Sequence, residues 1–172
     1  ALEAGSEARR MASRLLAFGR RQVVEPEPLD LPELIQDATK MLSQVAGHTV
    51  EVVPVVGPSC RRIYADRNQI RQVLMNLVVN ARDAMPDGGR VTIECYDVDV
   101  DARFSEVHLQ QRPGAYVVLS VTDTGEGMTE EVRSRLFEPF FTTKAAGRGT
   151  GLGLATVQSI ARESGGDVFV YS

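Results

Sequence analysis

RNQIRQVLMNLVVNARDAM, at residues 67–85, predicts a long helix with polar side chains set inside an apolar run. Asp66 precedes the helix as a favourable N-cap, and Gln69 follows three residues later as its capping-box partner. The sequence PDGG, at residues 86–89, ends the helix, because proline and glycine disfavour its continuation.

Three polar side chains share one face of this helix. Asn76, Asn80 and Asp83 are spaced four and three residues apart, among leucines and valines. Asparagine is a mediocre helix former, and a buried amide needs hydrogen-bond partners. One interpretation is an internal hydrogen-bonding pair that fixes packing. The other is a site for Mg²⁺, which accepts amide oxygens as ligands and usually arrives with phosphates.

Two glycine-containing clusters follow further along the chain. DTGEGM, at residues 123–128, comes after a predicted strand, where a carboxylate can accept a hydrogen bond from a nucleobase amine. GRGTGLGL, at residues 147–154, precedes a predicted helix whose N-terminus attracts anions, so it is suited to holding phosphates. The chain lacks the Walker A pattern, and no strand leads directly into the second cluster, which excludes the dinucleotide fingerprint. Taken singly, DTGEG is also compatible with an ordinary tight turn, and a glycine-rich loop alone is a weak signal.

Between these clusters lies FEPFFTTK, at residues 137–144. We expect its aromatic side chains to pack at the base of a mobile lid. Lys144 and Arg148 could reach phosphates as point charges, and a solvated basic loop is the alternative interpretation.

The remaining chain predicts helices and strands in alternation, with hairpins among them. Helices are predicted at about 31–45, 129–136 and 150–163, and strands at about 49–56, 63, 91–96, 116–122 and 168–171. We therefore expect an α+β fold, a two-layer sandwich of a mixed, mostly antiparallel sheet with helices on one face. Residues 22–30 contain two prolines and predict a linker, which separates a helical segment at residues 1–21 from a globular domain at residues 31–172.

Composition limits the classes of function. The 172-residue chain has a net charge of -4, which argues against a nucleic-acid partner because such binders present basic surfaces. No apolar run reaches the roughly 18 to 20 residues that span a bilayer. Cys60 and Cys95 show no CxxC spacing, so we expect a reduced, cytoplasmic setting and leave open whether the full-length protein is anchored to a membrane.

The four motifs taken in order are more specific than any one of them. An asparagine-bearing helix, DTGEG, FEPFFTTK and GRGTGLGL resemble the N, first glycine, F and second glycine boxes of sensor histidine kinases. The resemblance covers about residues 25–172 and places the chain in the gyrase, ninety-kilodalton chaperone, histidine kinase and MutL superfamily. NLVVNARDAMPDGG and FEPFFTTK look most like the nitrogen-regulation and hybrid kinase branch. The implied fold is the Bergerat-type ATP-binding fold.

The resemblance implies a role for each matching residue. Asn80 matches the asparagine that binds Mg²⁺ between the ATP phosphates, and Asn76 matches the upstream position that lines the same site. Asp123 matches the carboxylate that recognises the adenine amine, and residues 129–150 correspond to the ATP lid. The full expected ATP site comprises Asn76, Asn80, Asp83, Asp123, Gly125, Gly127, Met128, Lys144, Arg148, Gly149, Thr150, Gly151, Leu152 and Gly153, with Asn76 and Asn80 as the catalytic pair.

Two positions depart from the pattern of related families. Gyrase-like and MutL-like ATPases carry a glutamate as general base four residues before the metal asparagine, where this chain has Asn76. An amide cannot take a proton as a carboxylate does, which disfavours a hydrolysing clamp. Many histidine kinases carry a basic or aromatic residue three positions after the metal asparagine. This chain has Asp83 there, which could instead orient Arg82 or a water molecule.

The expected activity is transfer of the ATP γ-phosphoryl group to a histidine on a dimerisation domain, and from there to the receiver domain of a response regulator. Neither His48 nor His108 has the acidic residue and proline expected after an acceptor histidine. Residues 1–21 resemble the second helix of that dimerisation domain, and the full-length protein is expected to be a homodimer. A nucleotide-sensing module without transfer and a hydrolysing clamp are the alternatives.

Overall fold

Among the residues that the structure describes, the main sheet has three strands. A computed structural model describes residues 24–57, 60–101, 113–145 and 149–172. Strand β4 (Gly89–Val100) is central, parallel to β2 (Val50–Val56) and antiparallel to β5 (Gly114–Asp123). Outside this sheet, β1 (Glu27–Leu29) pairs antiparallel with β3 (Ile63–Ala65). The mixed sheet of the predicted α+β fold is therefore confirmed.

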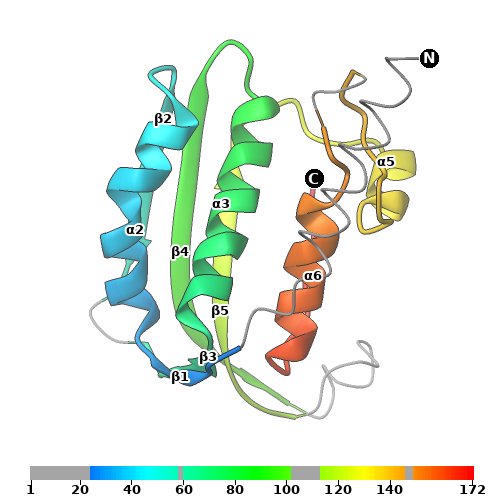
Figure 1. The fold of residues 1–172 in the computed structure, drawn as a ribbon. Coiled ribbons are helices and arrows are strands. Elements are labelled where there is room, and N and C mark those ends of the chain that lie inside the picture. Colours follow the sequence, from blue (N-terminus) through cyan, green and yellow to red (C-terminus); the bar gives the residue numbers. More distant parts are fainter. Residues whose placement is uncertain (1–23, 58–59, 102–112, 146–148) are drawn as a thin grey trace, which may run out of the picture.

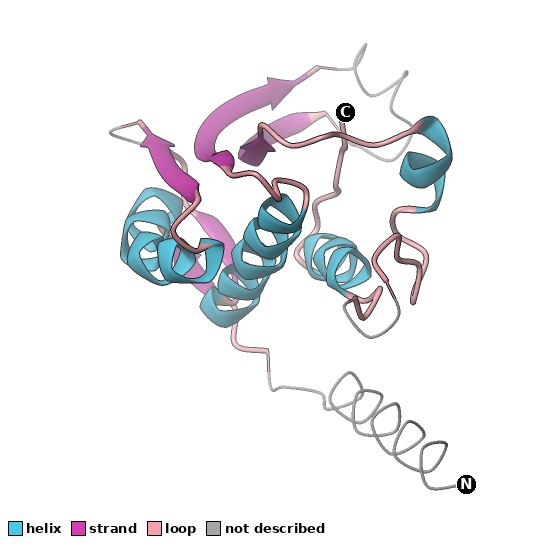
Figure 2. Cartoon of the chain, turned by 90° about the horizontal axis from the view of Figure 1, so that it is seen from above, coloured by secondary structure: helices cyan, strands magenta, loops and turns pink. Residues whose placement is uncertain are grey.

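Helices cover one face of the sheet, as the sequence predicts (Figures 1 and 2). They are α2 (Leu31–Ala46), α3 (Arg67–Asp83) and α6 (Gly153–Glu163), with a short α5 (Glu130–Arg135) in the connection before α6. Among the described residues, no helix combines the length and apolarity that a bilayer span requires.

The core lies between the helices and the sheet because the apolar faces of both meet there. Its fully buried members, all with no exposed surface, include Leu29, Leu34, Ile35, Leu42, Leu74, Val78, Val91 and Ile93. A second cluster joins α3 to α6 through Val73, Val157 and Ile160, with Leu119 of β5 packed against it. Helix α3 belongs to both clusters, so its position is fixed from two sides.

Two segments differ from the sequence expectation. Within the predicted linker, Glu27–Leu29 form a strand, because they pair with Ile63–Ala65 and Leu29 is fully buried. Residues 168–171 lie in no strand ladder; the Val168 N–H donates instead to the carboxylate of Asp167, at 2.9 Å. The predicted helix at residues 1–21 lies outside the described residues.

The predicted N-cap of α3 is confirmed, and it has one more partner than the sequence suggested. Asp66 is buried and accepts hydrogen bonds from the N–H groups of Asn68 at 2.8 Å and Gln69 at 3.0 Å. It also accepts one from the Glu25 N–H at 2.9 Å. The bond from Glu25, together with those from Gln69 and Asn68, lowers the pKa of Asp66 despite the opposing effect of burial.

Replacing Asp66 by alanine is expected to destabilise the domain by about 1–2 kcal/mol near neutral pH, through loss of the cap. Because the folded-state pKa is lowered, this stability is present above the unfolded pKa of about 3.9 and is lost as the pH falls through the folded value. Urea unfolding should therefore separate wild type from Asp66→Ala near neutrality and bring them together in strong acid.

Asp30→Ala is the matched control, because Asp30 caps α2 through a single bond, from the Glu33 N–H at 3.2 Å. Its cost should be smaller than that of Asp66→Ala. Equal losses in the two variants, or a loss for Asp66→Ala that does not change with pH, would contradict the role given to the Asp66 carboxylate.

Candidate functional site

The asparagine face of α3 lies against the start of α6. The side-chain amide of Asn76 donates to the Gly153 carbonyl at 3.2 Å. A Cβ atom on Gly153 would lie 3.8 Å from Asn76 Cγ and 3.8 Å from Asn80 Nδ2. The first turn of α6 is thus adjacent to both amides. For Asn76, the packing interpretation accounts for one of its two amide N–H groups.

The turn after β5 is attached to the C-terminal end of the same helix, just past the asparagines. Asp123 Oδ1 accepts a hydrogen bond from the Gly125 N–H at 2.9 Å, and Glu126 N–H donates to the Ala84 carbonyl at 3.2 Å. A Cβ atom on Gly125 would come within 2.6 Å of that carbonyl oxygen, so only glycine allows this approach. The C-terminal end of α3 therefore positions the Asp123 carboxylate.

The glycine loop before α6 is held by the FEPFFTTK segment. Phe140 N–H donates to the Gly151 carbonyl at 2.8 Å. Gly151 has φ +64°, and a Cβ atom there would overlap the backbone of Phe140. At the start of α6, the N-cap residue Leu152 makes no side-chain cap hydrogen bond to the first turn of the helix.

Lys144 reaches across to α3. Its ammonium group lies 2.5 Å from Asp83 Oδ2 and 3.3 Å from Asn80 Oδ1. Arg82 contacts the other oxygen of Asp83, from Nη2 at 2.6 Å and Nε at 2.9 Å. Burial acts to raise the pKa of Asp83, but the hydrogen bonds and charges of Lys144 and Arg82 outweigh it and leave the pKa lowered. Asp83 is therefore a carboxylate held between two cations.

The structure brings most of the predicted site residues together. Asn76, Asn80, Asp83, Lys144 and Gly153 are joined by the contacts above, and Gly149 packs on the stem of Lys144. Thr150 Oγ1 accepts the Leu152 N–H at 3.3 Å within the loop. Gly127 and Met128 instead face Ser172, whose hydroxyl accepts the Met128 N–H at 2.6 Å. Arg148 lies outside the described residues.

Two contributors were missed from the sequence. The Ala84 carbonyl anchors the Asp123 turn, and Thr142 Oγ1 accepts the Lys144 N–H at 3.2 Å. In the sequence, Ala84 stands out only as a small residue near the end of the predicted helix. For Thr142 the sequence offers only its place in the TTK run.

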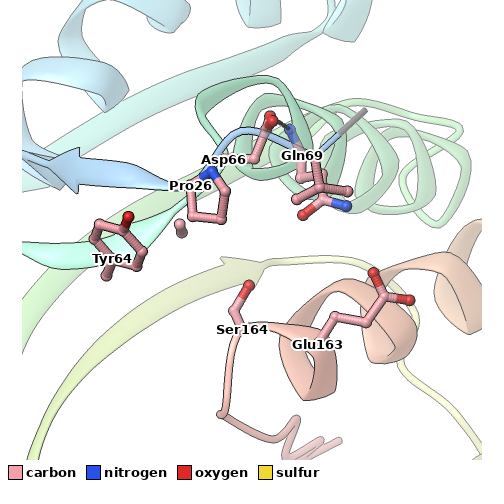
Figure 3. A pocket seen from close by; sticks show the side chains of 8 residues that line it. Pro26, Tyr64, Asp66, Gln69, Glu163 and Ser164 are labelled. Atoms are coloured by element: carbon pink, nitrogen blue, oxygen red, sulfur yellow. Dashed lines mark hydrogen bonds between the residues drawn. The ribbon is translucent and has the colours of Figure 1, made fainter. Parts of the chain in front are cut away.

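A hollow at the opposite end of α3 is separate from this site (Figure 3). Its lining includes Pro26, Tyr64, Asp66, Gln69, Glu163 and Ser164. Asp66 caps the start of α3, whereas Asn80 and Asp83 lie in its last two turns. The hollow therefore does not belong to the asparagine face.

The donor set suits a metal that keeps other ligands. Within the described ranges, no group of three or more histidine, cysteine, aspartate or glutamate side chains could hold a metal ion. The asparagine face instead offers an amide oxygen, Asn80 Oδ1, which accepts a hydrogen bond from the Lys144 ammonium at 3.3 Å. Mg²⁺ fits such a site, because it retains waters and binds through one or two protein oxygens together with substrate phosphates.

Comparison with known proteins identifies the class. Residues 65–172 match the family of histidine kinase-, DNA gyrase B- and HSP90-like ATPases, and the chain belongs to this family. It is similar to sensor kinase CckA of Brucella abortus (strain 2308), with 43% identity over 162 residues that cover 94% of this chain and 17% of CckA. The chain thus spans only a small part of the length of this curated relative.

Solved structures agree with the assignment. Full-length ShkA in complex with AMPPNP matches with a TM-score of 0.65 and 28% identity, over 93% of this chain and 32% of ShkA. The mycobacterial sensor histidine kinase MprB matches with a TM-score of 0.62 and 26% identity, over 82% of this chain and 81% of that one. The predicted resemblance to the ATP-binding domain of sensor histidine kinases is therefore confirmed.

Proposed function

We propose that this chain is the catalytic, ATP-binding domain of a sensor histidine kinase, which donates the γ-phosphoryl group of ATP to a histidine on a dimerisation domain of the same protein. The observation that carries the proposal is the convergence of the glycine loop and the Asp123 turn on the asparagine-bearing, C-terminal half of α3. Asn76 contacts Gly153 of the glycine loop, and Ala84 holds the Asp123 turn. Membership of the family supports ATP as the nucleotide.

Each part of the site has a proposed task. Asp123 accepts a hydrogen bond from the adenine amine, with its orientation fixed by the Gly125 N–H. The uncapped start of α6 and the glycine loop present backbone N–H groups to the phosphates. Asn80 holds Mg²⁺, which when bound neutralises charge on the β- and γ-phosphates. The remaining expected contacts come from Asp83, Met128, Lys144, Arg148, Thr150 and Leu152.

The geometry around Asn76 favours transfer over hydrolysis. Its side-chain N–H donates to the Gly153 carbonyl, and an amide has no basic site that could take a proton from water. A hydrolysing clamp needs such a base. We therefore infer that the site orients ATP for attack by an imidazole nitrogen: a P–N bond forms, the bond from phosphorus to the β–γ bridging oxygen breaks, and ADP leaves.

The surrounding protein is also part of the proposal. We assign residues 1–21 to the dimerisation domain and residues 22–30 to the linker, within which Glu27–Leu29 form β1, and the full-length kinase is a homodimer. The receiver domain of a response regulator accepts the phosphoryl group from the histidine. The catalytic domain works in the cytoplasm, where ATP is supplied.

A single-turnover experiment tests this function. The chain is mixed with γ-labelled ATP, Mg²⁺ and a separately produced dimerisation domain from a kinase of this family. We expect acid-labile label on the acceptor histidine, none on an acceptor in which that histidine is alanine, and little phosphate release from the chain alone. Sustained phosphate release without acceptor would favour a hydrolysing clamp. ATP binding with no label on any acceptor would favour a sensing module.

A further inference from the structure

The last turn of α3 carries a chain of charged contacts that leads to Asn80. Arg82 Nη1 donates to the Val45 carbonyl at the end of α2, at 3.1 Å, so its guanidinium is fixed on the side of α2. From there it holds Asp83 Oδ1, which leaves Asp83 Oδ2 for Lys144 at 2.5 Å. The two carboxylate oxygens are thus divided between a cation of the helix and a cation of the lid segment.

The stem of Lys144 is guided toward α3. A Cβ atom on Gly149 would lie 3.3 Å from both Cβ and Cδ of Lys144, so the glycine loop packs on this side chain. Thr142 Oγ1 accepts the Lys144 backbone N–H. The side chains of Lys144 and Asp83 are only 31% and 25% exposed. These contacts argue against the alternative interpretation of Lys144, in which it belongs to a fully solvated basic loop.

We propose that Asp83 is a positioning residue, which holds the ammonium group of Lys144 beside Asn80 so that this ammonium faces the phosphates of bound Mg·ATP. The proposal rests on the proposed function of the site and changes the role of Asp83 within it, from a direct phosphate contact to one made through Lys144. In effect, the lid segment supplies a positive charge close to position 83, where this chain has a carboxylate.

The arrangement has an electrostatic consequence. A carboxylate beside a triphosphate repels it, and the repulsion is strong where solvent is partly excluded. With Lys144 and Arg82 both bound, the three charged side chains carry a net positive charge. Without Lys144, Asp83 Oδ2 loses its cationic partner and remains as an uncompensated carboxylate oxygen near Asn80, the proposed metal ligand. Removing Lys144 therefore has two effects. The attraction between its ammonium and the triphosphate is lost, and the repulsion between the Asp83 carboxylate and the triphosphate is no longer offset.

A set of four variants tests this by calorimetric titration of the chain with Mg·ATP. Lys144→Ala should bind about tenfold more weakly than wild type, because a charge-assisted contact is lost. Adding Asp83→Lys to Lys144→Ala should recover most of the lost affinity for Mg·ATP, because a lysine at position 83 of α3 places its own ammonium near Asn80. Asp83→Ala should weaken binding when Lys144 is present and strengthen it when Lys144 is alanine.

Lys40→Ala is the matched control, because Lys40 is an exposed lysine on α2 whose removal changes the net charge equally. It should bind as wild type does, and thermal unfolding checks that every variant folds. Folded Lys144→Ala with unchanged affinity, or Asp83→Ala with the same effect in both backgrounds, would overturn this proposal alone. A wild-type chain that binds no Mg·ATP would overturn the proposed function as well.

Discussion

Replacing Gly151 by alanine is expected to lower the affinity for Mg·ATP about 100-fold, or about 2.7 kcal/mol, while the domain stays folded. Two physical reasons combine. Gly151 has φ +64°, which costs an alanine about 1–2 kcal/mol. Its Cβ atom would also overlap the backbone of Phe140, whose N–H donates to the Gly151 carbonyl at 2.8 Å. The loop must therefore move, and the N–H groups before α6 move with it.

Gly165→Ala separates the two reasons. Gly165 also has a positive φ, +78°, but a Cβ atom there would meet nothing within 4 Å. This control should lose about 1–2 kcal/mol of stability at most and bind Mg·ATP as wild type does. Calorimetric titration measures binding and urea unfolding measures stability. If Gly151→Ala bound ATP normally, the glycine loop could not be the phosphate cradle.

The elements that the sequence predicted well are those specified locally. The cap of α3 could be predicted from Asp66, because an N-cap side chain contacts backbone only two or three residues away. The helix predicted at about residues 31–45 is observed as α2, at Leu31–Ala46. The order of the four motifs likewise indicated the family, since the family of histidine kinase-, DNA gyrase B- and HSP90-like ATPases matches residues 65–172.

Contacts between distant segments could not be predicted in this way. Strand β1 lies in a proline-containing stretch and exists because it pairs with β3, so its signal is tertiary rather than local. The parallel pairing of β2 with β4 is equally non-local. Within the site, the ion pair of Lys144 with Asp83 joins residues 61 positions apart. The sequence indicated both charges near the phosphates but not that each would be the partner of the other.

Replacing Asn80 by alanine should remove most of the Mg²⁺ dependence of ATP binding and lower phosphoryl transfer about 100-fold or more, because an oxygen that helps neutralise the transferring group is lost. Asn80 Oδ1 is a hard oxygen beside the ammonium of Lys144, on the helix face that contacts the start of α6. Titrating ATP with and without Mg²⁺ isolates the metal-linked part of the affinity. Wild type should gain from the metal, and Asn80→Ala should not.

Asn68→Ala provides the comparison within the same helix. Asn68 is an exposed asparagine in the first turn of α3, whereas Asn80 lies in its last turns, so both changes remove one amide from one helix. Asn68→Ala should keep the Mg²⁺ response and transfer the phosphoryl group at the wild-type rate. If folded Asn80→Ala kept its metal response, Asn80 would not be the metal ligand, and its amide would have only a packing role beside the start of α6. The two asparagines thus distinguish a ligand from a packing group by a measurement that does not depend on stability.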